Sequence, residues 1–377
     1  MTFEINNIAG REPLVDYPWR TEVDRLLSWL VDKDSHIQAF CFDLVMSSAY
    51  IDATAGIEKS IEQCDNIEDK YNAHLGFINL CSPCYTNNET WSYQKAVKPQ
   101  SGALGKLSSE VILRFIEKLY PQLNEVIAVG GTEAADAVLK HKNGMVILAE
   151  VKSAPLLTYP FLFKAPNSCL KGEHEKLIIT NSQLRACDSA IFLHSIGPVN
   201  LGKVGDDLWP FKPLVDFLIE EVNMPIIQKC INEWLSARDA YSKKDRQNKM
   251  YYLANASGSP PKIAKDRDGW PKKESISDSK TSAGMDRTDD IKKGIYQSLK
   301  IGTNLKDEPS IKTAIISNLP AYRHGQEYVD PFVDMLWGLD EDISELNGQK
   351  GILSNRLRRA FDFIITLEEP ILRDINL

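Results

Sequence analysis

The chain has 377 residues, of which 43% are hydrophobic and 25% are charged, with a net charge of −8. This length allows one large domain or two ordinary ones, and the composition is typical of a globular protein. No apolar run approaches the roughly 18 residues of a membrane span, and the N-terminus lacks the features of a signal peptide. The seven cysteines are an odd number that does not indicate a disulfide framework. We therefore expect a cytoplasmic protein with reduced thiols and no membrane partner.

Residues 1–100 are predicted to form a mostly helical N-terminal region. Trp19–Lys33 has apolar residues at near-helical spacing, whereas Phe40–Ile51 fits a helix or a strand. Residues 82–90 are turn-rich and predict a loop. Cys81 and Cys84 have the spacing of a metal or redox pair, but no second such pair completes a zinc site. We interpret these two cysteines as incidental.

An amphipathic helix is predicted over Gly105–Tyr120, with Ser108 or Ser109 as its cap and Pro121 at its end. Glu110 lies in its first turn. This carboxylate either interacts favourably with the helix dipole or serves as a third acidic ligand of a metal site. A short strand is expected over Asn124–Val129.

Two apolar runs, Ala137–Leu139 and Met145–Val151, flank the turn Lys142-Asn143-Gly144. An Asn-Gly pair between strand-forming residues predicts a β-hairpin. Asp136 opens the first strand, and Glu150 and Lys152 lie near the end of the second. Residues two apart share a strand face, so two carboxylates and one ammonium are expected to converge at one end of the hairpin.

This group of charges suits Mg²⁺, which prefers oxygen ligands and takes one or two carboxylates with waters and a phosphate. Lys152 could hold a water molecule or stabilise the charge that develops on the phosphate. The alternative interpretation is a solvated hairpin with ordinary surface charges. Charges that follow a buried-looking strand favour the functional interpretation.

Beyond the hairpin, residues 155–166 predict a loop, Glu173–Cys187 predicts a helix, and Ser189–His194 predicts a buried strand whose terminal His194 is interpreted as structural. A helical pattern over Leu214–Ala237 is broken near Pro225. Helices that alternate with strands indicate an α/β fold with a central sheet.

The segment from Arg238 to Lys293 holds fourteen Lys or Arg against nine Asp or Glu, although the chain is acidic overall. Residues 238–285 therefore predict a basic flexible insert or loop. It is either a solvated linker or an arm that contacts DNA, with Tyr251, Tyr252 and Trp270 packing on sugars or bases. The candidate phosphate-binding residues are Lys262, Lys265, Arg267, Lys272, Lys273, Lys280 and Arg287.

The C-terminal region, residues 286–377, predicts a helix that begins at Thr288 and ends at Gly302. Strands are expected at Lys312–Ser317 and Ala360–Leu367, with a helix over Tyr328–Leu339 between them. We expect the two strands to join the sheet of the core region, residues 101–237.

The order of a helix, Asp136, Glu150-Val-Lys152 on a hairpin, a helix and a strand resembles the PD-(D/E)XK nuclease core, which is best known from type II restriction endonucleases. The resemblance covers about Ser101–Ser195, and Ala135 stands where the motif has proline. It implies a mixed sheet flanked by helices, with a helical N-terminal part and a C-terminal elaboration. It also implies Mg²⁺-dependent hydrolysis of double-stranded DNA, with Asp136 and Glu150 as metal ligands, Lys152 orienting the water, and Glu110 at the position of an extra helical acid.

The predicted function is site-specific cleavage of DNA by a homodimer, because palindromic sites mirror two-fold proteins. Such an enzyme implies a cognate DNA methyltransferase that acts on the same site without forming a stable complex. A structure-specific repair or recombination nuclease is the alternative enzyme. A non-catalytic DNA-binding protein with incidental hairpin charges is the alternative outside the enzymes.

Overall fold

The computed structural model describes residues 17–54, 59–64, 67, 70–99, 101–129, 135–169, 176–277, 283–286, 288–305, 308, 310–338 and 357–368. The chain divides into two compact units made of separate stretches of sequence. Unit 1 comprises Met1–Asp16, Ser108–Ala154 and Gly284–Leu377, and unit 2 comprises Tyr17–Leu107 and Pro155–Ala283. Within the described ranges, no helix is both long enough and apolar enough to cross a membrane.

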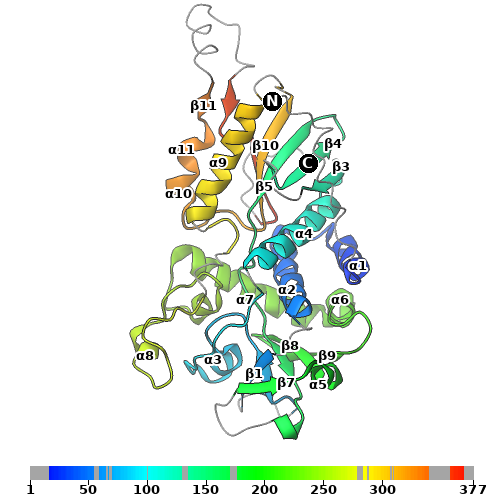
Figure 1. Cartoon of the computed structure of the whole chain (residues 1–377), viewed down its shortest axis with the longest axis vertical. Helices are drawn as coiled ribbons and strands as arrows, with labels where there is room; N and C mark the ends of the chain where they lie inside the picture. The colour runs from blue at the N-terminus through cyan, green and yellow to red at the C-terminus, as the bar shows by residue number, and fades with distance from the viewer. Residues whose placement is uncertain are drawn as a thin grey trace, which may run out of the picture. The chain divides into compact units, whose positions relative to one another are not determined.

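Unit 1 is built on a mixed sheet whose described strands have the order β13-β10-β5-β4-β3 (Figure 1). The hairpin strands and β3 are antiparallel to one another, whereas β10 lies parallel to both β5 and β13. β5 is therefore the central strand. The bounds are β3 (Leu123–Ala128), β4 (Ala137–His141), β5 (Val146–Val151), β10 (Ile311–Ser317) and β13 (Phe363–Thr366). The two late strands expected from the sequence are thus β10 and β13, in the sheet of the hairpin.

The predicted hairpin turn is confirmed. Gly144 has φ of 89°, a conformation that glycine adopts without steric cost. The side chain of Asn143 accepts a hydrogen bond from the backbone N–H of Met145 at 2.9 Å, and the N–H of His141 donates to the Met145 carbonyl at 2.9 Å. The turn therefore fixes the register in which Ala137 faces Ala149.

One face of this sheet is covered by α9 (Thr288–Asn304), which Figure 1 shows alongside β10. Ile301 and Leu305 pack on Val138 and Leu148, while Ile295 packs in a second cluster on β10. Each fully buried side chain of this size contributes roughly 2 kcal/mol of hydrophobic stabilisation. The helix continues past Gly302, where we expected it to end, because the residues on both sides still pack on the sheet.

The helix predicted over Tyr328–Leu339 is wrong. That stretch holds α10 (Gly325–Tyr328), α11 (Asp330–Val333) and the short strand β11 (Leu336–Trp337), which pairs with β12 (Arg358–Arg359). Pro331 lies in the first turn of α11. Because proline lacks a backbone N–H and clashes with the preceding turn, it starts a new helix instead of continuing the old one.

Two contacts attach the helix α4 (Ser101–Leu119) to unit 1. The hydroxyl of Ser108 donates to the Ser153 carbonyl at 2.7 Å, just beyond the end of β5. At the other end of the helix, the Tyr120 hydroxyl donates to the Thr366 carbonyl at 3.0 Å. The helix begins seven residues before Ser108, so neither predicted serine is its N-cap.

The chain leaves unit 1 after Ala154 and re-enters it at Gly284, and these two points are joined. The N–H of Gly284 donates to the Ala154 carbonyl at 2.8 Å, and Asn318 at the end of β10 bonds both backbone groups of Ala154. Gly284 has φ of 54°, and a side chain there would meet Leu319 at 2.7 Å. The 129 residues between these two points, 155–283, belong to unit 2. Because they begin and end beside each other, they do not separate the strands of the sheet in unit 1.

Unit 2 contains an antiparallel sheet with the order β7-β1-β2-β6-β8-β9 among its described strands. Their bounds are β1 (Lys59–Gln63), β2 (Ala73–Leu75), β6 (Phe161–Phe163), β7 (Lys176–Ile179), β8 (Asp188–Leu193) and β9 (Gly197–Lys203). The helical segments are α1 (Arg20–Leu30), α2 (Ser35–Thr54), α3 (Ser82–Asn88), η2 (Asn167–Cys169), α5 (Asn181–Ala186), α6 (Phe211–Ile219), η3 (Glu221–Asn223), α7 (Met224–Lys243), η4 (Lys249–Leu253) and α8 (Lys262–Lys265).

Several predictions for the segments of unit 2 are wrong. The helix expected over Glu173–Cys187 begins outside the described residues, and from Lys176 onward the chain forms strand β7 followed by the short α5, since Thr180 forms a capping box with Gln183 that starts a helix there. The loop expected over residues 82–90 contains α3, and residues 155–166 contain β6. The strand expected at Ser189–His194 is present as β8, but it belongs to this second sheet. Residues 155–237 therefore lie outside the unit that holds the hairpin.

The described residues of the segment 238–285, which are 238–277 and 283–285, are also more ordered than the composition predicted. Tyr251, Tyr252 and Trp270 are at most 5% exposed, and Tyr252 and Trp270 pack edge-on against Trp91 and Tyr93. These rings are therefore core residues of unit 2 and cannot stack on nucleic acid. Tyr251 and Tyr252 lie in the short 3-10 helix η4, and Trp270 lies outside any helix or strand, so these rings show no α-helical or strand periodicity.

Asp43 is the central polar residue of unit 2. It is fully buried in α2 and accepts hydrogen bonds from the backbone N–H groups of Leu156 and Leu157 and from the indole of Trp234, at 3.1, 2.8 and 2.7 Å. Burial raises its pKa to about 8, although these three donors oppose the rise. One side chain thus connects α2, the segment before β6, and α7.

Replacing Asp43 with alanine should lower the free energy of unfolding by about 3 kcal/mol, because three buried donors lose their acceptor. Urea unfolding followed by tryptophan fluorescence measures this loss. Asp52→Ala, on the exposed side of the same helix, is the matched control and should change the value by less than about 0.5 kcal/mol. Equal effects of the two variants would contradict the assignment.

Candidate active site at the end of the hairpin

The pairing of β4 with β5 brings Asp136 beside Glu150 and Lys152. Ala137 faces Ala149, and the N–H of Asp136 donates to the Ala149 carbonyl at 3.0 Å. The carboxylate of Asp136 then accepts the N–H of Val151 at 2.9 Å through Oδ2. The second strand thus orients the first acid of the predicted triad through its own backbone, a contact that sequence patterns do not reveal.

Lys152 lies between the two carboxylates. Its Nζ donates to Oε1 of Glu150 at 2.5 Å and lies 3.8 Å from Oδ2 of Asp136. The ammonium also donates to the Val151 carbonyl at 3.1 Å. The side chains of Glu150, Lys152 and Asp136 are 10%, 20% and 43% exposed, so the group opens to solvent on the Asp136 side. The predicted convergence of the three charges is confirmed.

The electrostatics of the group centre on Glu150. Burial and, to a lesser extent, the charge of Asp136 raise the pKa of Glu150 from 4.5 to about 7, while Lys152 acts in the opposite direction. Glu150 is therefore partly protonated near neutral pH, and a bound cation would favour release of that proton.

The donor set fits a hard divalent cation. Asp136 and Glu150 offer carboxylate oxygens, and the orientation of Asp136 by the Val151 N–H leaves Oδ1 outside that hydrogen bond. Glu110 is 9% exposed on α4, two residues after Ser108, whose hydroxyl contacts the residue that follows Lys152. Its assignment as an additional metal ligand therefore stays a prediction.

The predicted phosphate-binding residues lie in unit 2 wherever the structure describes them. Lys262, Arg267, Lys272 and Lys273 are exposed on and after α8, and Lys265 is half-buried. Lys280 and Arg287 lie outside the described residues. The exposed residues form a basic surface segment of the second unit, and their role in DNA contact stays a prediction.

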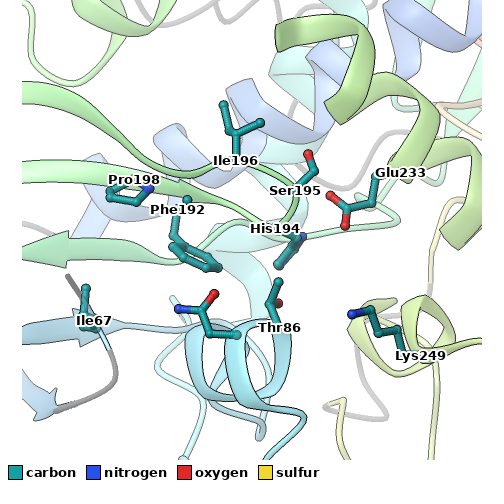
Figure 2. A pocket seen from close by; sticks show the side chains of 11 residues that line it. Ile67, Thr86, Phe192, His194, Ser195, Ile196, Pro198, Glu233 and Lys249 are labelled. Carbon is teal, nitrogen blue, oxygen red and sulfur yellow. The ribbon is translucent and has the colours of Figure 1, made fainter.

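A separate pocket of about 420 Å³ lies within unit 2, lined by α3, the β8–β9 turn, α7 and η4 (Figure 2). His194 is buried against Tyr159 and Phe192, and burial lowers its pKa to about 3. A histidine that remains neutral cannot exchange protons near pH 7, which agrees with a structural role. Glu233 and Lys249 give the pocket charged groups, but neither was singled out from the sequence.

In comparisons with protein-family models, curated proteins and solved structures, nothing matches this chain.

The raised pKa of Glu150 predicts a pH-dependent stability. Unfolded Glu150 ionises near pH 4.5, whereas the folded group stays protonated until about pH 7, so folding stability should fall as the pH rises through this window. In Glu150→Gln this loss disappears, and at pH 8 the variant should be more stable than the parent by on the order of 1 kcal/mol, after discounting for partial exposure.

Urea unfolding at pH 5, 6, 7 and 8 measures the difference between parent and variant. Glu125→Gln is the matched control, because Glu125 lies on β3 of the same sheet and is 46% exposed in its pair with Lys140. A constant difference between Glu150→Gln and the parent across this pH range would show that Glu150 does not titrate abnormally.

Proposed function

We propose that this chain is a Mg²⁺-dependent endonuclease that hydrolyses phosphodiester bonds of double-stranded DNA at a specific sequence, as type II restriction endonucleases do. The observation that carries the proposal is the convergence of Asp136, Glu150 and Lys152 at the end of a buried central strand. Charges are costly at such a position unless they are paired or bind a ligand, so their grouping there favours a functional site over surface charge.

The element order of unit 1 supports the proposal. Helix α4, strands β3, β4 and β5, helix α9 and strand β10 follow the order on which the resemblance to the PD-(D/E)XK core rests. The sequence predicted that the helix and the strand after the hairpin would be Glu173–Cys187 and Ser189–His194. In the structure these two places are taken by α9 and β10, because residues 155–283 of unit 2 intervene between β5 and α9. With this interruption allowed, the part of α4 from Ser108 onward, the hairpin, α9 and β10 lie in one unit.

The residues of the site suggest a division of roles. Mg²⁺ held by Asp136 and Glu150 would offset charge on the scissile phosphate and lower the pKa of a bound water. Asp136 is oriented for this by the Val151 N–H, and Glu150 gives up its proton when a cation is bound. Lys152, which now balances both carboxylates, is then able to orient the attacking water or stabilise the phosphate.

Cleavage of a palindromic site would place two copies of the chain on the two strands, so the proposal includes a homodimer. The host would protect its own DNA with a methyltransferase that acts on the same site without a stable complex.

The proposal predicts that Asp136→Asn, Glu150→Gln and Lys152→Met each lower the rate of Mg²⁺-dependent plasmid cleavage by about 100-fold or more, because each removes a charge that acts on the reacting phosphate. The readout is the production of discrete fragments over time. Glu125→Gln and Lys140→Met are matched controls, since they remove an exposed carboxylate–ammonium pair of the same sheet and should leave cleavage unchanged.

Other results would favour the alternatives. Cutting confined to junctions or branched DNA would indicate a repair nuclease, and DNA binding without any Mg²⁺-dependent cleavage would indicate a binding protein. Cleavage that survives all three substitutions would contradict the site assignment itself.

The exposed basic segment of unit 2 is expected to make the DNA affinity depend on salt. If its side chains bind phosphates, the steepness of log K against log salt should fall by about 0.9 for each phosphate that is no longer neutralised. The test combines glutamine substitutions at Lys262, Lys265, Arg267, Lys272 and Lys273.

Filter binding or fluorescence anisotropy at several salt concentrations gives the slope. Lys212→Gln is the control, because Lys212 is exposed on α6 and pairs with Asp216 outside the basic segment. A slope equal to the parent's after all five substitutions would exclude this segment from the DNA interface.

A further inference from the structure

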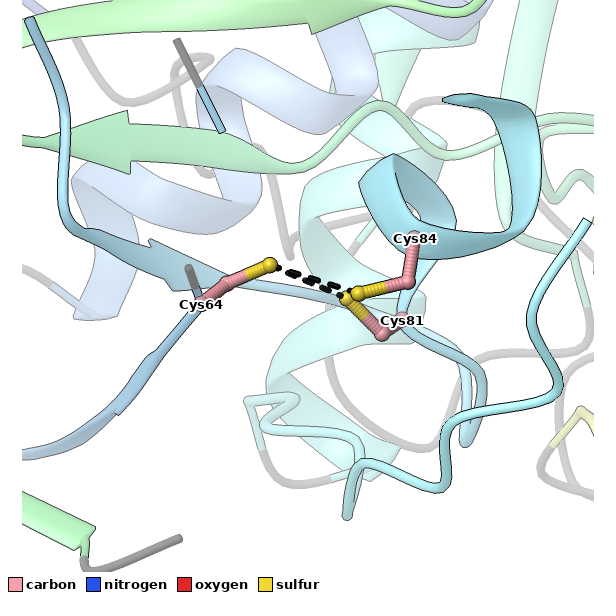
Figure 3. Close-up of side chains that lie close together, drawn as sticks. All are labelled: Cys64, Cys81 and Cys84. Carbon is pink, nitrogen blue, oxygen red and sulfur yellow. Dashed lines mark hydrogen bonds between the residues drawn. The ribbon is translucent and has the colours of Figure 1, made fainter. Parts of the chain in front are cut away.

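Three cysteines of unit 2 come together in the fold although the sequence separates them. Cys64 follows β1, while Cys81 and Cys84 lie at the start of α3 (Figure 3). The sulfur of Cys64 is 3.8 Å from that of Cys81 and 3.4 Å from that of Cys84, and all three lie within 4.8 Å of one another. The sequence showed only the Cys81/Cys84 pair and thus appeared to lack a further ligand.

These distances fit a tetrahedral metal better than a disulfide. A zinc ion with Zn–S bonds of about 2.3 Å in tetrahedral geometry separates its sulfur ligands by about 3.8 Å. A disulfide requires a sulfur–sulfur distance of about 2.05 Å. The three sulfur atoms are therefore spaced as ligands of one ion would be.

The backbone around the cluster is well defined. The N–H of Cys64 donates to the Asn72 carbonyl, next to β2, and the N–H of Cys81 donates to the Ser92 carbonyl at 2.9 Å. Cys81 precedes the first turn of α3 and Cys84 lies within it, and a separation of three residues places both side chains on one side of a helix. Two separate chain segments thus present thiols to the same point without further rearrangement of the backbone.

The surroundings exclude water. The three cysteines are 4–6% exposed and pack with Ile67, Tyr71, Leu162 and Phe192. Hydrogen bonds with Cys64 and Cys84, together with burial, raise the pKa of Cys81, so this thiol is protonated in the metal-free protein. Binding of a thiophilic ion would release this proton.

His74 supplies a candidate for the fourth ligand. Glu62 faces His74 across the β1–β2 pair, and Cys64 is two residues beyond Glu62, so all three side chains belong to one face. Nδ1 of His74 contacts the Glu62 carbonyl at 3.1 Å, and since a carbonyl only accepts, Nδ1 carries the proton. Nε2 is left as the basic nitrogen, oriented as the histidine ligands of metals are.

The environment of His74 is consistent with this assignment. The residue is 2% exposed, and its Nε2 is buried without a hydrogen-bond partner. Burial lowers the pKa of His74, while the Glu62 carbonyl, the nearby Cys84 and Gln94 oppose this effect. The side chain of Gln94 lies beside the imidazole. The imidazole lies outside the set of three sulfur atoms, so the fourth bond needs a side-chain movement.

We propose that Cys64, Cys81 and Cys84, with His74 as the fourth ligand, form a structural zinc site that joins the β1–β2 pair to α3. Thiolate and imidazole donors favour zinc over the oxygen-seeking Mg²⁺, and four protein ligands leave no open position for catalysis. The site is independent of the proposed nuclease function, because its residues and its metal both differ from those at the hairpin.

The test uses the full chain purified under reducing conditions without added metal. Elemental analysis should find about one zinc per chain. After the zinc is exchanged for Co²⁺, the protein should show the visible bands of tetrahedral cobalt and the near-ultraviolet sulfur-to-cobalt charge transfer. Cys64→Ser, Cys81→Ser and Cys84→Ser should each lose the stoichiometric metal, whereas Cys187→Ser, at a buried cysteine outside the cluster, should retain it. His74→Ala should keep the charge-transfer band and shift the visible bands.

If the serine variants fail to fold, the parent protein still decides the question. Alkylation followed by mass spectrometry should show Cys64, Cys81 and Cys84 protected until a chelator is added. Absence of stoichiometric metal, together with no sulfur-to-cobalt band on reconstitution, would overturn the proposal. So would detection of a disulfide among the three cysteines, or full metal retention in the serine variants. Unchanged visible bands in His74→Ala would overturn the assignment of the fourth ligand.

Discussion

The placement of β5 at the centre of its sheet is the constraint on which unit 1 depends. Its backbone is paired with β4 on one edge and with β10 on the other, and Ile147–Ala149 are fully buried. Charged side chains near the end of such a strand are costly unless other charges or a ligand are available. Glu150 is the penultimate residue of β5, Lys152 follows the strand, and the hairpin register brings Asp136 to them. The proposed catalytic group is therefore a consequence of how the buried strand ends.

The chain passes from unit 1 into unit 2 just beyond this end of β5. Ala154 comes two residues after Lys152, and its backbone is bonded to Gly284 and Asn318, so the start and the end of the intervening segment are fixed beside each other. This arrangement explains how a long segment separates β5 from α9 in sequence while both remain in one unit. An insertion whose ends are adjacent imposes little strain on the sheet that carries it. The position of Lys152 therefore does not depend on the length of the inserted segment.

The two units present chemically different donor sets. The hairpin offers carboxylate oxygens, with Lys152 balancing their charge, and the proposed function uses them for a hard ion exchanged with solvent. The thiols near α3 are buried in an apolar shell, and the proposed zinc there would serve stability. The degree of burial differs between the hairpin carboxylates and the cysteine cluster, and it favours a different kind of ligand at each. Partial exposure of Asp136 leaves room for a substrate, whereas enclosure of the sulfur atoms favours a permanent ligand.

The sequence by itself determined the features that depend on neighbouring residues. These are the hairpin with its Asn143-Gly144 turn, the helices with regular apolar spacing, and the convergence of Asp136, Glu150 and Lys152, because turn chemistry and strand alternation are local properties. Tertiary structure alone decided which distant segments complete each sheet, since β10 and β8 have similar apolar patterns but pair in different units. It also decided the burial of Tyr251 and Trp270 and the meeting of Cys64 with Cys81 and Cys84. Those outcomes depend on long-range packing, which leaves no periodic trace in the chain.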